Sequence, residues 1–177
     1  MSAQVSLAAS AALLCLCSIA WAGQSLPSIA VLDFELIDET QDTSPETLAA
    51  QKKRLGLISG QLRRELSDGG LYRVIDSAPA ANYIGELKAR QELHACNGCE
   101  LDIGKKLGAD LVLTAWVQKV SNLILNINIE IKRVGSGKTL LNKSVDIRGN
   151  TDQSWSRGIS YMVRDMVEKK QGGVGWL

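Results

Sequence analysis

The segment NLILNINIEIK, residues 122–132, alternates apolar and polar side chains with a period of two. Successive side chains of a β-strand point to opposite faces, so this pattern predicts a strand with one face on a core and the other in water. The predicted inward set is Leu123, Leu125, Ile127, Ile129 and Ile131. The alternation resumes at 139–148, with Leu141, Val145 and Ile147 inward. The two segments predict a β-hairpin whose outer face is polar.

The connection between these strands, VGSGKTLL at 134–141, resembles the end of a nucleotide-binding P-loop. A P-loop needs a strand, then a glycine-rich loop that opens a helix, so that backbone N–H groups hold phosphate. It also needs a glycine five residues before Gly137, where this chain has Lys132. Because both flanks alternate at period two, the sequence predicts a hairpin turn in which glycines supply positive φ.

The rest of the chain predicts alternating strands and helices. Short apolar runs predict strands at 28–34, 71–76 and 109–119, and the acidic stretch 35–44 is expected to be a solvated loop. Predicted helices begin at Ser44-Pro45, at Pro79, just after the cysteine pair and near Thr151. Two apolar stripes at helical spacing support the first and last helices: Leu48, Leu55, Ile58, Leu62 and Leu66, and Trp155, Ile159, Met162, Val163 and Met166.

This order predicts an α/β fold: a single-layer mixed sheet of about five strands, with helices mainly on one face. The domain is expected to span 23–170, followed by a flexible glycine-rich tail at 171–177. Before it, residues 1–22 run apolar and end in Ala20-Trp21-Ala22, the pattern of a secretory signal peptide cleaved after Ala22. We therefore expect export to the periplasm and no stable membrane span after cleavage. The net charge of +1 gives no argument for binding nucleic acid.

Cys15 and Cys17 would leave with the signal peptide, so the mature chain keeps Cys96 and Cys99. In an oxidising compartment such a pair predicts a disulfide. Haem attachment of the c type needs histidine after the second cysteine, and residue 100 is Glu. A structural zinc site usually has four ligands, whereas the pair and His94 supply at most three. We predict no metal and no cofactor, and keep thiol-redox exchange and free thiols as alternatives.

Several stretches resemble a known group of envelope proteins: IAVLDFE, LSDGGLYRVID and IGKKLGADLVLTAWVQKV, followed by a hairpin with a glycine turn. In this order they resemble the amino-terminal domain of TolB and the related domain of the curli-secretion protein CsgG. CNGCELDIGKKLGAD, QKVSNLILNINI and DIRGNTDQSWSRG look like an uncharacterised family of small exported bacterial proteins. The resemblance implies a periplasmic docking module without assigned activity. The β-propeller of TolB and the pore-forming strands of CsgG have no counterpart here, so neither function transfers.

The leading functional hypothesis is a non-enzymatic interaction module or accessory subunit of an envelope or secreted-enzyme system, with another periplasmic or envelope protein as partner. If strand parity holds, Trp116 and Thr114 share the polar face with Asn126 and Asn128, and a tryptophan among short polar residues is typical of an interface hot spot. The alternative is that the terminal helix or the tail covers Trp116. An open face or an unpaired edge would also permit a homo-oligomer.

Two other functions remain open. The first is a periplasmic thiol-redox or metal-handling protein that uses Cys96 and Cys99. The second is a small hydrolase, which would need a pocket that gathers carboxylates such as Asp33, Glu35 and Asp76, because the sequence offers no nucleophile–base pair.

Overall fold

A computed structural model describes residues 25–40 and 42–173, which form one six-stranded mixed sheet with helices on both faces. The predicted signal peptide and residues 174–177 of the predicted tail lie outside this part. The sheet order is β3-β1-β4-β5-β6, with β2 beside β4 as well. Its strands are β1 (Ser28–Val31), β2 (Glu35–Asp38), β3 (Arg73–Ile75), β4 (Leu111–Lys119), β5 (Ile124–Arg133) and β6 (Thr139–Arg148). The pairs among β1, β2, β3 and β4 are parallel, whereas β4, β5 and β6 pair antiparallel.

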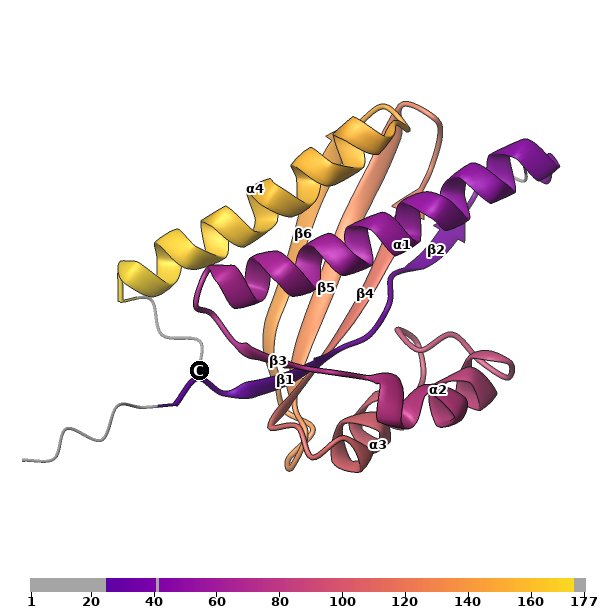
Figure 1. The fold of residues 1–177 in the computed structure, drawn as a ribbon. Helices are drawn as coiled ribbons and strands as arrows, with labels where there is room; N and C mark the ends of the chain where they lie inside the picture. The colour runs from indigo at the N-terminus through magenta and orange to yellow at the C-terminus, as the bar shows by residue number, and fades with distance from the viewer. Residues whose placement is uncertain (1–24, 41, 174–177) are drawn as a thin grey trace, which may run out of the picture.

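Four α-helices cover the sheet unequally (Figure 1). They are α1 (Pro45–Asp68), α2 (Ala81–Lys88), α3 (Cys99–Lys106) and α4 (Asp152–Gln171). A 3-10 turn, Ala78–Ala80, leads into α2. Helices α1 and α4 pack on one face, and α2 and α3 lie on the other, over its parallel part. The antiparallel strands β5 and β6 are thus left open on one side. None of the described helices is long and apolar enough to cross a membrane.

The larger core lies between the sheet and the helices α1 and α4, and the predicted inward faces supply most of it. All five predicted stripe residues of α4 are buried. On α1, Ile58, Leu62 and Leu66 are fully buried, but Leu48 is 49% exposed, so its prediction is wrong. The reason is that the start of α1 extends past the sheet (Figure 1). Leu123 is also wrongly predicted: it is 72% exposed because β5 begins only at Ile124.

The predicted strand 28–34 is interrupted, and the predicted loop after it contains strand β2. Residues 32–34 lie opposite only two residues of β4, 114 and 115, because Val31 pairs with Leu113 and Glu35 pairs with Trp116. This extra residue is a β-bulge. In uninterrupted pairing Glu35 would fall opposite Val117 and point into the helix-covered core, since a shift of one residue exchanges the two faces of a strand. The bulge instead places Glu35 on the other face, beside Trp116.

The turn between β5 and β6 is a hairpin connection, as predicted. Gly137 N–H donates to Arg133 O at 2.8 Å, and Gly137 has a φ of 68°. No helix follows the glycines, so the segment lacks the geometry of a P-loop. The predicted fold class is confirmed, with β2 as a sixth strand and with helices α2 and α3 on the second face.

Candidate functional site

The open side of β4, β5 and β6 presents a polar surface around Trp116. Trp116 pairs with Asn128, and Gln118 pairs with Asn126, so these side chains point to the same face. Ser144 and Asp146 of β6 continue both rows. We call this surface the Trp116 face and define it as Trp116, Gln118, Asn126, Asn128, Ser144 and Asp146. Within it, Asn126 Nδ2 donates to Asp146 Oδ1 at 2.5 Å and Ser144 Oγ donates to Asn126 Oδ1 at 2.8 Å.

Trp116 is half-buried, and helix α4, one of the two segments that the sequence suggested as its cover, does not cover it. Helix α4 packs on the opposite face of the sheet. The other suggested segment was the tail, whose residues 174–177 lie outside the described part. Among the described residues, the ring of His94 stacks on the indole, with ring centroids 5.2 Å apart and an interplanar angle of 24°. Thr114, one row further along β4, is only 3% exposed and therefore lies beneath the surface.

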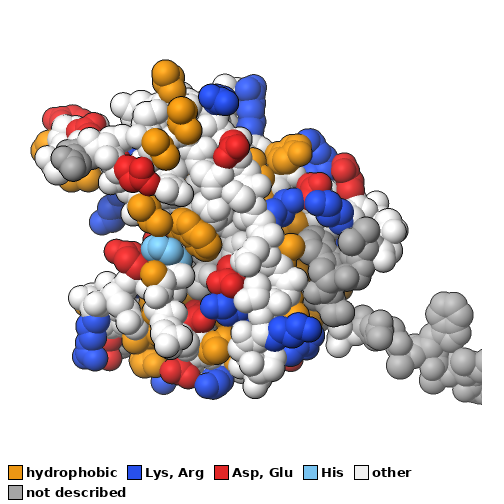
Figure 2. All heavy atoms as spheres, turned by 180° about the vertical axis from the view of Figure 1, so that it is seen from behind, with side chains coloured by type: hydrophobic (Ala, Val, Ile, Leu, Met, Phe, Trp, Pro, Cys, Tyr) orange, Lys and Arg blue, Asp and Glu red, His pale blue; other side chains and the backbone are white. Residues whose placement is uncertain are grey.

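Hydrophobic side chains adjoin this face at the tip of the β4–β5 hairpin. Val120, Leu123 and Ile124 are 47%, 72% and 49% exposed. Figure 2 shows hydrophobic side chains extending from beside the pale-blue His94 toward one end of the molecule. The exposed surface thus combines short amides, one aromatic ring and an apolar tip, which is the mixture found in protein interfaces.

Glu35 fixes the loop that carries His94. Its carboxylate accepts the backbone N–H groups of Leu93 at 2.7 Å and His94 at 2.8 Å. The Nδ1 atom of His94 lies 2.6 Å from Glu35 Oε2, and because a carboxylate only accepts, Nδ1–H is the donor. Glu35 is 9% exposed, so these bonds are largely shielded from water. The position of His94 over Trp116 therefore depends on the bulge that aims Glu35.

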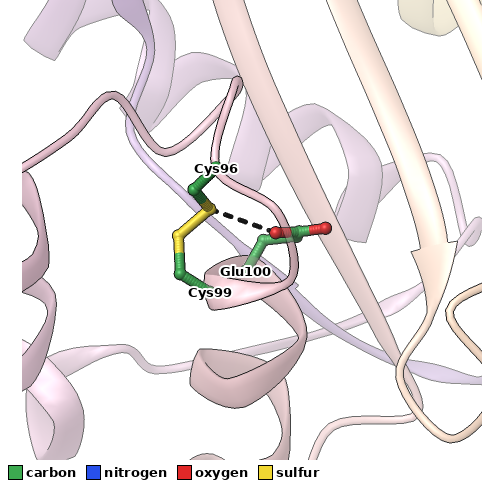
Figure 3. Close-up of side chains that lie close together, drawn as sticks. All are labelled: Cys96, Cys99 and Glu100. Carbon is green, nitrogen blue, oxygen red and sulfur yellow. Dashed lines mark hydrogen bonds between the residues drawn. A yellow bond between two sulfur atoms is a disulfide. The ribbon is translucent and has the colours of Figure 1, made fainter.

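Cys96 and Cys99 form a disulfide at the other end of the same loop (Figure 3). Helix α3 begins at Cys99, and Cys96 lies on the loop just before it. Glu100 in the first turn is 2% exposed; its Oε2 atom lies 3.1 Å from Cys96 Sγ, and its Oε1 atom accepts from Lys132 Nζ at 2.9 Å. Burial lowers the pKa of Lys132, but its hydrogen bonds to Glu100 and Glu130 outweigh burial and raise it. Lys132 is therefore charged at neutral pH, and its contact with Glu100 anchors the loop to β5.

Within residues 25–40 and 42–173, two groups of side chains combine residue types that bind metals, and some members of each have other partners. In the group Cys96, Cys99 and Glu100, the sulfurs are bonded to each other and Glu100 pairs with Lys132. In the group Glu35, Glu92 and His94, the Glu35 oxygens accept three hydrogen bonds from the loop.

The carboxylates considered for hydrolysis have separate partners. Asp33 pairs with Arg63 at 2.7 Å and Lys88 at 3.6 Å, whereas Asp76 Oδ1 accepts the N–H of Ala78. Burial raises the pKa of Asp33, but Arg63 and Lys88 outweigh it and hold that pKa below its usual range. An ionised, paired Asp33 is a poor general acid.

The sequence singles out Trp116 as a candidate interface residue and predicts the disulfide, but it does not predict the contact between Glu35 and His94. The missed signal is the alternation in FELID, residues 34–38, where Phe34 and Leu36 flank Glu35. The acidic residues that follow favoured the prediction of a solvated loop instead of a strand.

The architecture defines the class: a small mixed α/β domain with one partly open sheet face. The C-terminal domain of LpoB from Salmonella enterica has this fold, with a TM-score of 0.50, 13% identity and coverage of 72% of this chain and 87% of that domain. The chain belongs to the family DUF3280, described as "Protein of unknown function (DUF2380)", which matches residues 27–167. The predicted membership of an uncharacterised family is thereby confirmed. No curated protein matches the sequence.

Two other solved structures are similar at lower TM-scores. The lipoprotein GNA1162 from Neisseria meningitidis gives a TM-score of 0.49 and 18% identity, covering 84% of this chain and 99% of that one. TolB from Acinetobacter baumannii gives 0.44 and 13% identity, covering 84% of this chain but 29% of TolB.

Proposed function

We propose that this protein is an exported, non-enzymatic interaction module, an accessory subunit of an envelope or secreted-enzyme system in the periplasm. The observation that carries this proposal is the Trp116 face: an antiparallel sheet surface that no described helix covers, with a half-buried tryptophan at its edge. The partner is another envelope protein whose surface offers hydrogen-bonding groups to the amides and an apolar contact to the indole and the hairpin tip.

The energetics favour Trp116, Asn126 and Asn128 as the binding residues. Trp116 is held by its stack on His94, so little side-chain entropy is lost on binding. Replacing a hot-spot residue of this kind with alanine typically weakens the binding free energy by about 2 kcal/mol or more. The asparagines already hydrogen-bond within the face, which keeps them in place for a partner.

Partner capture tests the face. The tagged protein is cross-linked in its own host's envelope, and captured proteins are quantified for wild type, Trp116→Ala, Asn128→Arg and the control Leu57→Arg on α1, whose leucine is 40% exposed. We expect at least one envelope protein that wild type and the control capture equally and that both face variants lose tenfold or more. Equal capture by all four proteins would refute the proposal. A fall in the melting temperature of Asn128→Arg by more than about 5 °C would assign this side chain to the fold instead.

Export and the state of the cysteine pair are tested by the intact mass of the protein from the envelope fraction, with and without a thiol-alkylating reagent. We expect a chain that starts at Gly23, is two hydrogens lighter than the reduced form and does not react. A chain that retains residues 1–22, or one that takes two alkyl groups, would contradict the proposal and favour a thiol-based function.

A further inference from the structure

The outer edge of β6 is a second surface with unused binding capacity. β6 pairs only with β5 among the described strands, so its other edge is free. Gly149 N–H donates to Leu123 O at 3.1 Å, just beyond the pair Ile124–Arg148. In an antiparallel ladder every second residue faces its partner strand, so the N–H and C=O groups of residues 142, 144, 146 and 148 point outward.

Lys143 divides this edge into a half where strand pairing is disfavoured and an open half where it is not. Its side chain points inward, between Leu141 and Val145, and forms an ion pair with Asp165 of α4. An inward-pointing charge on an edge strand disfavours pairing with another strand nearby. The open half is therefore residues 144–148.

A groove of about 700 Å³ runs beside this open half. The first half of α4 forms its opposite wall, and Figure 1 shows α4 running from the end of β6 beside the sheet edge. Gly158 gives the close approach at its base, because a Cβ atom there would lie 2.7 Å from Ile127 Cδ1 and 2.8 Å from Ile147 Cγ2. Tyr161, 52% exposed, adds an aromatic wall.

The charges of the groove favour an acidic occupant. Arg148 and Arg157 both line it and are exposed, and neither forms an ion pair in the described part of the chain. Asp146 also lines it, but its carboxylate accepts a hydrogen bond from Asn126, so the two arginines are left in excess. A second copy of this chain would bring the same two arginines to the interface, and like charges at close range disfavour that pairing.

We propose that residues 144–148 of β6, with the groove beside them, bind an extended acidic segment of a partner protein as an additional β-strand. The outward groups of residues 144, 146 and 148 supply main-chain hydrogen bonds, as in other complexes formed by strand addition. Arg148 and Arg157 pair with carboxylates of the segment, and Tyr161 packs on an apolar side chain between them. Ser144 and Asp146 belong to both surfaces, but the Trp116 face uses their side chains and this site uses their outward backbone groups, so a backbone variant at residue 144 tests this site separately from the proposed function.

The probe is an acetylated, amidated heptapeptide that alternates valine with glutamate, compared with the same peptide carrying lysine at the glutamate positions. Binding to the full mature chain is followed by amide resonances in NMR titration. Ser144→Pro removes one outward N–H without removing a bond to β5, and Ser144→Ala is the matched control that keeps it. Arg157→Glu is a second variant, exposed and remote from the core, that tests the charge term.

We expect the glutamate peptide to shift and protect the amides of residues 144, 146 and 148. Ser144→Ala should bind within twofold of wild type, Ser144→Pro at least tenfold more weakly, and Arg157→Glu should prefer the lysine peptide. Equal binding by the proline and alanine variants would overturn the strand-addition geometry. Shifts confined to residues 116, 118, 126 and 128 of β4 and β5 would overturn the site. Concentration-dependent shifts at β6 without peptide would overturn the proposed occupant.

Discussion

Replacing Glu35 with alanine should release the loop that holds His94 over Trp116. The substitution removes the acceptor of two backbone N–H groups, the buried one of Leu93 and the part-buried one of His94. An unsatisfied buried donor costs about 1–3 kcal/mol, and water entering beside the partly exposed His94 recovers some of that cost. We therefore expect Glu35→Ala to lower the free energy of unfolding by about 3 kcal/mol, which a domain of typical stability survives folded.

The assay is urea unfolding combined with amide hydrogen exchange. Because each 1.4 kcal/mol corresponds to about a tenfold change in an equilibrium, exchange at Leu93 and His94 should accelerate by about 100-fold. Glu92→Ala is the control, since Glu92 is exposed in the same loop and should change stability by less than about 0.5 kcal/mol. If Glu35→Ala unfolds within 0.5 kcal/mol of wild type and exchange at both amides is unchanged, Glu35 does not fix the loop.

Three further predictions concern the disulfide, the α4 packing and pH. The double change Cys96→Ser and Cys99→Ser should lower stability by about 2 kcal/mol, the entropy of closing so short a loop; chemical denaturation measures this, and no loss would contradict the disulfide. Gly158→Ala should cost about 1–3 kcal/mol by overpacking against β5 and β6, whereas Gly85→Ala, with open space around it, should be neutral or stabilising in the same melting experiment. Burial raises the pKa of Asp38, but hydrogen bonds from Thr40, Lys119 and Gln51 outweigh it and lower the pKa to about 2. Because the folded-state value lies below the unfolded one, stability is present above about pH 4 and is lost as pH falls toward 2, and Asp38→Asn should remove this part of the pH dependence.

The period of apolar side chains along the sequence gave the most accurate predictions of which residues are buried. Residues 125–131 and the α4 stripe were placed correctly because their side-chain period alone decides which face is buried. The errors at Leu48 and Leu123 arose where an apolar pattern continues past the point at which its element packs on the sheet.

The candidate site could be predicted only in part. Trp116 and its neighbours on the face follow from strand parity, and the cysteine pair follows from spacing. The contact of Glu35 with His94 joins residues 59 positions apart. It also depends on the bulge at residues 32–34, which no local sequence pattern predicts. Long-range contacts of this kind depend on how elements dock rather than on how each one forms.

The bulge also determines where the chain can vary in length. Loss of one residue within β2 would exchange the faces of those that follow, moving apolar side chains out of the core. Loss of Asp33 would instead leave two residues opposite residues 114 and 115 of β4, so that Glu35 would still pair with Trp116. β1 and β2 would then fuse into one continuous strand beside β4, with every side chain on its present face. Position 33 is thus the point between β1 and β2 at which a chain one residue shorter keeps the same sheet, and what is lost is the pairing of Asp33 with Arg63 and Lys88.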